Sequence, residues 1–302
     1  MSKLVECVPN FSEGRNVEII ESIVDEVRKV EGVKLLDYSS DKDHNRSVVT
    51  FLGAPDEVEK AAFNLIKRAA ELIDMRKHRG AHPRMGATDV VPFIPIKDVT
   101  TEECVEISQR LGKKVGDELR IPVYLYEDAA SCAERKNLAN IRKGQYEGFF
   151  EKIKQPEWKP DFGPDEINVK SGATVIGARF PLVAYNINLG TDDVEVANAI
   201  ARKIRYIGGG LRYVKAVGVK VTERNIVQVS MNLVNYEKTP IYAAQEMVKM
   251  EAKRYGVPVV GSEVIGLVPM KVLIDCAEYY LQIENFNMSQ VLESRISRSS
   301  DS

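Results

Sequence analysis

Residues 226–234 read Ile226-Val227-Gln228-Val229-Ser230-Met231-Asn232-Leu233-Val234, an alternation of apolar and polar side chains. Successive side chains of a β-strand point to opposite faces of its sheet, so this stretch predicts a strand with one apolar and one polar face. Residues 213–221 predict its hairpin partner, and a strand at 182–189 places Asn186 and Asn188 on one face. The polar face has two interpretations: a solvated surface, or a polar wall that faces the first half of the chain across a cleft.

Helices separate these strands in the second half of the chain. Thr191 is expected to cap a helix that runs to about Ile204, and residues 242–255 predict a second helix. A strand at 257–260 follows. A last helix at 270–281 is expected to turn four side chains inward: Leu273, Cys276, Ala277 and Tyr280.

The first half has the same order of elements: strand, helix, strand, strand, helix, strand. Its clearest helix carries a continuous apolar stripe from Val58 to Ile73, and residues 16–31 predict another helix, closed by Gly32. Strands are expected at 4–8, 33–37, 47–52 and 89–96, followed by a helix from about Thr101 and a strand at 121–126. Residues 154–172 are rich in Pro and Gly without apolar periodicity, which predicts a linker or long loop.

Each half is therefore expected to form a ferredoxin-like βαββαβ subdomain, at residues 1–178 and 179–302. The predicted fold class is α/β (α+β), with helices on one side of each mostly antiparallel sheet and a cleft or tunnel between the two sheets.

Composition narrows the class of protein. Lys and Arg number 42 against 44 Asp and Glu, and this balance argues against a dedicated nucleic-acid binder. Apolar runs such as 123–126 are far too short to span a bilayer, and the first residues lack a secretion signal. The four cysteines are scattered without paired spacing, which argues against a disulfide framework or a zinc knuckle. We therefore expect a cytoplasmic enzyme or small-molecule binder.

Residues 76–86 carry two of the chain's three histidines among Lys and Arg side chains, in the order RKHRGAHPRMG. A metal site is disfavoured, because Gly80 and Pro83 oppose the helix that would align His78 with His82, and because the cations repel a metal. A solvated basic turn without function is a second interpretation. The third is a general base beside an anion-binding cluster, since nearby cations lower the pKa of an imidazole and keep it neutral.

Two other polar stretches carry weaker signals. Residues 41–46 (DKDHNR) predict a hairpin loop, with a carboxylate that orients a histidine as the alternative. Residues 208–210 are three glycines that follow a helix and match no phosphate-binding fingerprint. They are interpreted as a tight turn or as a close approach of the backbone to a ligand.

Five segments of the chain, taken together, resemble the formiminotransferase family. They are residues 4–14 (LVECVPNFSEG), 82–87 (HPRMGA), 161–164 (DFGP), 186–189 (NINL) and 259–269 (VVGSEVIGLVP). The segments span nearly the whole chain in order, which makes the resemblance specific.

The resemblance implies transfer of the formimino group from N-formimino-L-glutamate to N5 of tetrahydrofolate, a step of histidine degradation that yields 5-formimidoyltetrahydrofolate and L-glutamate. Tetrahydrofolate would be a co-substrate, and no metal is implied. His82 would be the catalytic general acid/base, and we expect Lys77, Arg79 and Arg84 to bind substrate or folate carboxylates. The folate-contacting stretches fall on these residues: Gly163, Pro164, Asp165, Glu166, Ile167, Asn168, Val169, Lys170, Ser171 and Gly172, then Gly209, Gly210, Leu211, Arg212, Tyr213, Val214, Lys215, Ala216, Val217 and Gly218.

Two alternatives stay open. The same site is compatible with transfer of the formyl group of 5-formyltetrahydrofolate to glutamate, and a non-catalytic folate-binding protein would keep the same fold. An RNA-binding version is disfavoured, because the chain has no extended basic stripe and no RNP aromatic motif. In animals the family's domain is fused to a cyclodeaminase, for which 302 residues are expected to leave no room, and the family suggests a homodimer.

Overall fold

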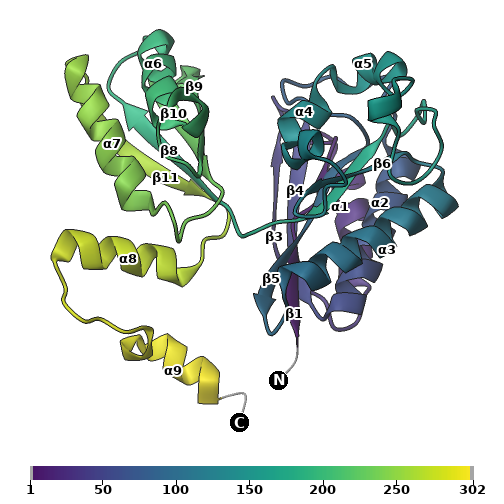
Figure 1. The fold of residues 1–302 in the computed structure, drawn as a ribbon, viewed down its shortest axis with the longest axis horizontal. Coiled ribbons are helices and arrows are strands. Elements are labelled where there is room, and N and C mark those ends of the chain that lie inside the picture. The colour runs from purple at the N-terminus through teal and green to yellow at the C-terminus, as the bar shows by residue number, and fades with distance from the viewer. Residues whose placement is uncertain (1–2, 300–302) are drawn as a thin grey trace. The chain divides into compact units, whose positions relative to one another are not determined.

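The computed structural model describes residues 3–299. Its contacts divide the chain into two units, Met1–Arg179 and Phe180–Ser302, each with its own sheet and core (Figure 1). The two-subdomain α+β class expected from the sequence is confirmed.

Within the described part of the first unit, seven strands form one sheet. They are β1 (Leu4–Cys7), β2 (Asn10–Phe11), β3 (Lys34–Asp41), β4 (Arg46–Gly53), β5 (Thr88–Lys97), β6 (Val123–Glu127) and β7 (Thr174–Ala178). The strands β5, β1, β4 and β3 pair antiparallel in that order, which is the ferredoxin-like arrangement. β5 then pairs parallel with β7, and β7 with β6, so the sheet extends beyond the predicted unit.

Three helices cover one face of this sheet: α1 (Val17–Arg28), α2 (Pro55–Leu72) and α3 (Thr101–Leu119) (Figure 1). α2 begins with Pro55 at its first turn and buries the predicted apolar stripe, while a capping box between Thr100 and Glu103 starts α3. The amphipathic pattern of each helix therefore sets which side faces the sheet.

The other face of the first sheet is also partly covered by helices. The sequence had predicted helices on one face only. Two short helices, α4 (Leu138–Arg142) and α5 (Gln145–Lys152), pack Ile141 and Phe149 against Tyr124 and Val175 in a second small core. Residues 154–172 form a long loop, as predicted, but they do not link the units. Phe162 O accepts a hydrogen bond from Val123 N at 2.9 Å, and the loop leads into β7 of the same sheet.

In the second unit, the described strands are β8 (Val183–Leu189), β9 (Val214–Val221), β10 (Ile226–Leu233) and β11 (Val259–Ile265). They pair antiparallel in the order β11, β8, β10, β9, again the ferredoxin-like order. The helices are α6 (Val194–Ile204), α7 (Ile241–Arg254), α8 (Met270–Leu281) and α9 (Leu292–Ser299).

The alternation in β10 is confirmed. Val227, Val229, Met231 and Leu233 are buried in the core with residues of α6 and α7. On the opposite face, Nε2 of Gln228 donates to Asn188 Oδ1 and to Glu263 Oε1, both at 2.7 Å. The polar side chains of this face therefore form a hydrogen-bonded network across three strands.

Three local predictions for the second half were wrong. Asp193, not Thr191, caps α6, because its side chain accepts from Glu195 N. The last strand occupies 259–265 rather than 257–260. In α8 the prediction was wrong for Leu273 and Tyr280, which are about half exposed at 51% and 47%, whereas Cys276 packs against the core as predicted. The apolar periodicity of residues 270–281 predicted the helix, but it did not predict how much of the apolar face of the helix would be buried.

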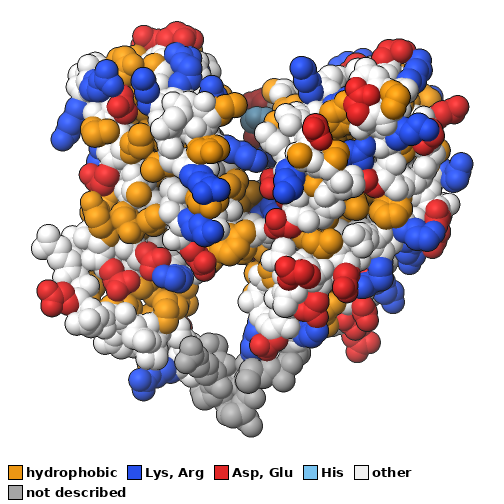
Figure 2. Space-filling model, viewed as in Figure 1, with side chains coloured by type: hydrophobic (Ala, Val, Ile, Leu, Met, Phe, Trp, Pro, Cys, Tyr) orange, Lys and Arg blue, Asp and Glu red, His pale blue; other side chains and the backbone are white. Residues whose placement is uncertain are grey.

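No helix in the described residues is long and apolar enough to cross a membrane. Basic and acidic side chains are interspersed on the face shown in Figure 2.

Candidate active site

Residues 73–87, the histidine-rich loop, connect α2 to β5. Backbone hydrogen bonds fix the loop at both ends. Met75 is fully buried, and its N–H donates to Lys170 O at 2.8 Å. Near the other end, the N–H of Ala87 donates to Ser171 O, also at 2.8 Å. The segment that carries His82 is therefore held against the end of the first stretch named for folate, residues 163–172.

Gly86 and Gly172 make this close approach possible. They form an isolated β-bridge, and Gly172 has a φ of +74°. A Cβ at Gly86 would lie 2.2 Å from Ala173 O, and one at Gly172 would lie 2.1 Å from Met85 O. Neither position accepts a side chain unless the backbone moves, so the two glycines set the distance between the two segments.

His78 and Arg84 hold the loop together. Nε2 of the buried His78 ring lies 2.9 Å from Asn45 O, and Nδ1 accepts a hydrogen bond from Nε of Arg84 at 3.2 Å. A ring that accepts at Nδ1 and donates at Nε2 is neutral, and burial lowers the pKa of His78. Arg84 is itself buried and donates two 2.8 Å hydrogen bonds to Glu147. Its guanidinium is therefore already paired, unlike the substrate-binding cation that the sequence suggested.

Replacing Arg84 by methionine is expected to lower the free energy of unfolding by about 2–3 kcal/mol, because Nδ1 of His78 and the Glu147 carboxylate both lose their donor. Arg79→Met on the same loop is the matched control: Arg79 is exposed, and its loss should change that free energy by about 0.5 kcal/mol or less. Urea unfolding of both variants measures this, and equal effects would contradict a structural role for Arg84.

His82 is half-buried and has cationic surroundings. Nη1 of Arg46, the first residue of β4, lies 3.3 Å from Nε2 and 3.5 Å from Nδ1 of the ring. Arg46 is therefore within hydrogen-bonding distance of both ring nitrogens, and the nitrogen that accepts from it depends on the tautomer of the ring.

Burial and the charges of these neighbours together set the protonation state of His82. Burial is the largest cause and the charges of Arg46 and Arg142 follow; together they lower the pKa of His82 to about 3. His44 acts in the same direction and Asp41 opposes it. The ring is therefore neutral at pH 7 and can accept a proton, as the third interpretation of this loop requires.

The low pKa of His82 makes the folded state sensitive to acid. In the unfolded chain the pKa of this histidine is about 6.5. Between pH 6.5 and about pH 3 the imidazole is therefore protonated in the unfolded chain but not in the folded protein, so the free energy of unfolding decreases as the pH falls. His82→Gln removes this group, so the variant should lose roughly 2 kcal/mol less stability than the wild type between pH 7 and pH 5. Denaturant unfolding at the two pH values tests this; parallel losses in both proteins would show that His82 is not held neutral.

The two arginines beside His82 were missed by sequence reasoning. Residues 41–46 do form the hairpin predicted between β3 and β4, and Asp41 there does contact a histidine. That histidine is His44, with Nδ1 2.9 Å from Asp41 Oδ2, and the two rings of His44 and His82 lie 6.2 Å apart. The alternation of β4 could have placed Arg46 on the face opposite Val49. Arg142 ends α4, for which no element was predicted.

The second stretch named for folate, residues 209–218, lies in the second unit. Gly209 has a φ of +86° with open space around it, in the tight turn that the three glycines predicted. Gly218 on β9 lies against α6, where a Cβ would be 2.5 Å from the backbone N of Asn198. The neighbouring Val217 points to the opposite, polar face and is 53% exposed.

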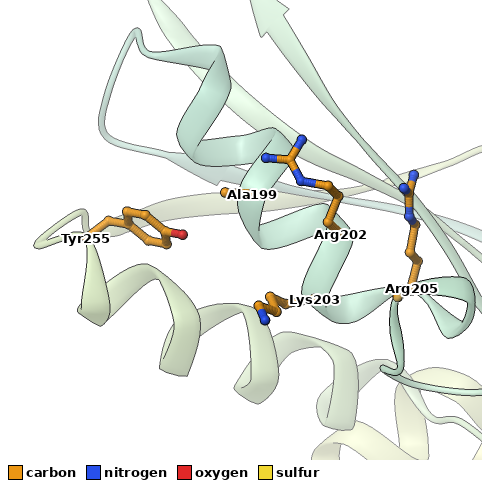
Figure 3. A pocket seen from close by; sticks show the side chains of 6 residues that line it. Ala199, Arg202, Lys203, Arg205 and Tyr255 are labelled. Atoms are coloured by element: carbon orange, nitrogen blue, oxygen red, sulfur yellow. The ribbon is translucent and has the colours of Figure 1, made fainter.

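A hollow of about 430 Å³ adjoins this turn, lined by Ala199, Arg202, Lys203, Arg205, Gly208 and Tyr255. Figure 3 shows Lys203 on the side of α6 towards Tyr255, while Arg202 and Arg205 point elsewhere. Its cations do not converge on one point as they do around His82. Within residues 3–299, no group of three or more His, Cys, Asp or Glu side chains is placed to hold a metal ion.

The fold and this cluster define a two-subdomain α+β protein with a neutral histidine between two arginines. The chain belongs to the formiminotransferase family: residues 4–179 match the formiminotransferase domain, N-terminal subdomain, and residues 184–298 match the formiminotransferase domain. It is 55% identical over 297 residues to the glutamate formimidoyltransferase of Streptococcus pyogenes serotype M1, covering 98% of this chain and 99% of that one.

Two other relatives extend the comparison. The glutamate formimidoyltransferase of Thermoplasma acidophilum is 51% identical over 300 residues, which cover 99% of both chains. The formimidoyltransferase-cyclodeaminase of Dictyostelium discoideum is 46% identical over 304 residues, which cover 98% of this chain and 56% of that one.

Proposed function

We propose that this protein is a one-carbon transferase that moves the formimino group of N-formimino-L-glutamate to N5 of tetrahydrofolate, releasing 5-formimidoyltetrahydrofolate and L-glutamate. The observation that carries the proposal is full-length similarity, at 51–55% identity, to two enzymes named for formimidoyl transfer to or from glutamate. The His82 site supports it, because it supplies the one group this chemistry needs.

The reaction is balanced without a metal or a redox cofactor. N5 attacks the amidine carbon, the N5–C bond forms, and the bond from that carbon to the glutamate nitrogen then breaks. One proton leaves N5 and one reaches the departing amine. A single base that accepts the first proton and returns it satisfies both steps.

His82 fits that role. Burial and nearby cations lower the pKa of its ring, which is therefore neutral at pH 7, and its loop is anchored at both ends. We assign the acid/base role to His82, and we assign tetrahydrofolate binding to residues 163–172 and 209–218. The backbone contacts between Ser171, Gly172 and the His82 loop support the first of these stretches. Ser171 adds a buried Oγ that has no partner among the described residues.

The test compares two donor pairs. Purified protein with N-formimino-L-glutamate and tetrahydrofolate should produce 5-formimidoyltetrahydrofolate, followed by its absorbance, whereas 5-formyltetrahydrofolate with glutamate should turn over far more slowly. Turnover with the second pair alone would replace formimino transfer by folate salvage. Folate binding without turnover of either pair would leave a non-catalytic binder.

We also propose a cytoplasmic homodimer. The four cysteines are free thiols in the structure, as expected in a reducing compartment. The exposed apolar side chains of α8, among them Leu273 and Leu281, are a surface that a second copy of the chain can cover.

A further inference from the structure

The polar face of the second sheet holds one carboxylate in a defined position. Glu263 on β11 accepts hydrogen bonds at Oε1 from Nε2 of Gln228, at 2.7 Å, and from Nδ2 of Asn186, at 3.2 Å. Gln228 donates its second N–H to Asn188 Oδ1, also at 2.7 Å, so both donors of that amide are used. Because Glu263 and Asn188 accept from the same nitrogen, their side chains lie side by side.

This network leaves two hydrogen-bonding atoms unused. Oε2 of Glu263 and Nδ2 of Asn188 have no partner among residues 3–299. Glu263 is an exposed residue, and Nδ2 of Asn188 is not closed off from solvent. The amides that hold the Glu263 carboxylate are uncharged and do not neutralise it. The face therefore offers a charged acceptor next to an amide donor.

Gly261 keeps the Asn188 donor uncovered. Gly261 on β11 pairs with Asn188 on β8, and an added Cβ would lie 3.6 Å from Nδ2 of Asn188 in otherwise open space. A larger residue at this position would therefore cover the donor, whereas glycine leaves it within reach of a ligand.

The network adjoins the second stretch assigned to tetrahydrofolate, residues 209–218. Gln228 pairs with Val219 on β9, and Ser230 pairs with Val217, which belongs to that stretch. Both valine side chains are exposed. An apolar surface therefore lies directly beside oriented hydrogen-bonding groups, a combination that suits a flat heterocycle with a polar edge.

We propose that Glu263 and Asn188 bind the pterin ring of tetrahydrofolate at its 2-amino-4-oxopyrimidine edge, with Gln228 as the residue that positions the carboxylate. The proposal rests on the proposed function and names the groups that recognise the ring of its co-substrate. That edge presents two neighbouring donors, the 2-amino group and N3–H, followed by the O4 acceptor. A carboxylate accepts from two such donors in parallel, as it does from a guanidinium, and the amide N–H of Asn188 matches O4.

Glu263→Gln tests the carboxylate. Glutamine keeps the length of the side chain and one oxygen for Gln228 and Asn186, so the fold is preserved, but it turns an N–H towards the donors of the ring. Binding of tetrahydrofolate, measured anaerobically by calorimetry, should weaken roughly 10- to 100-fold, as loss of a charge-assisted hydrogen bond predicts. Glu223→Gln, at the exposed turn between β9 and β10, is the matched control and should bind as the wild type does.

Gly261→Val tests the Asn188 donor. The valine would enter open space, so the fold is preserved, but its methyl groups would cover Nδ2 of Asn188. Tetrahydrofolate binding should weaken roughly 10-fold or more, and unchanged binding would remove Asn188 from the site.

An analogue of tetrahydrofolate that lacks the 2-amino group separates recognition from a structural effect. The wild type should bind the analogue more weakly than tetrahydrofolate, whereas Glu263→Gln should bind the two about equally. Unchanged tetrahydrofolate binding in Glu263→Gln, or the same loss for both ligands, would overturn the proposal. These readouts need no turnover, so a protein that binds tetrahydrofolate through Glu263 but transfers no formimino group would refute the proposed function alone.

Discussion

Replacing His82 by alanine is expected to lower kcat for formimino transfer by ~10²–10⁴-fold, the usual contribution of a positioned acid/base group. Without the imidazole, no described group on this loop can take the proton from N5 and return it to the glutamate nitrogen. His78 cannot take over, because its ring is buried and both its nitrogens are bonded to Asn45 and Arg84. KM should change little, since the ring does not carry the charges that bind substrate.

Arg76→Ala serves as the matched control for His82→Ala. It removes an exposed side chain of the same loop that is paired only with Asp74, and its kcat should stay within about two-fold of the wild type. Thermal unfolding of His82→Ala should show an intact fold. A kcat for His82→Ala within a few-fold of the wild type would remove His82 from the acid/base role.

Gly172→Ala is expected to lower the free energy of unfolding by roughly 3–5 kcal/mol, in the range reserved for strained or clashing backbone sites. The new Cβ would meet Met85 O at 2.1 Å and Gly86 Cα at 2.7 Å, and both are backbone atoms that cannot rotate away. The φ of +74° adds the ordinary cost of left-handed backbone for alanine. Because the clash pushes the His82 loop away from β7, the folded fraction should also lose activity.

Gly256→Ala separates the clash from the backbone conformation. Gly256 has a φ of +65° but no atom within 4 Å of an added Cβ, so its substitution should cost only about 1–2 kcal/mol. Chemical denaturation of both variants gives the comparison. If Gly172→Ala were no more destabilised than Gly256→Ala, the close contact between the His82 loop and residues 171–173 would be wrong.

The parts of the fold that the sequence predicts are those with a short-range signal. The stripe along α2 and the alternation of β10 each fix one buried face by local periodicity, and both are confirmed. β7 has no such signal. Its five residues are all buried, on both faces, and they follow a long loop, so nothing local distinguishes them from that loop. The parallel pairs of β7 with β5 and β6 are long-range contacts that no pattern within one segment contains.

The candidate site, like the fold, could be predicted from the sequence only in part. The resemblance and the local chemistry of the loop both single out His82, but its partners come from elsewhere in the chain. Arg46 lies 36 residues away in the sequence, and Arg142 belongs to a short helix with little periodicity. Arg84 looked like a substrate-binding cation because its partner, Glu147, lies 63 residues further along the chain. Charge in a sequence does not show which cations are already paired, and only the fold supplies that information.

The most direct test of the account follows the transferred carbon. N-formimino-L-glutamate labelled with ¹³C at the formimino carbon is mixed with tetrahydrofolate and the protein, and the label is observed by NMR. We predict that the labelled carbon leaves the glutamate nitrogen and appears on N5 of tetrahydrofolate, with one L-glutamate released for each carbon moved. A label that stays on glutamate at enzyme concentrations close to those of the substrate, or that appears as formate or formamide, would contradict transfer to the folate.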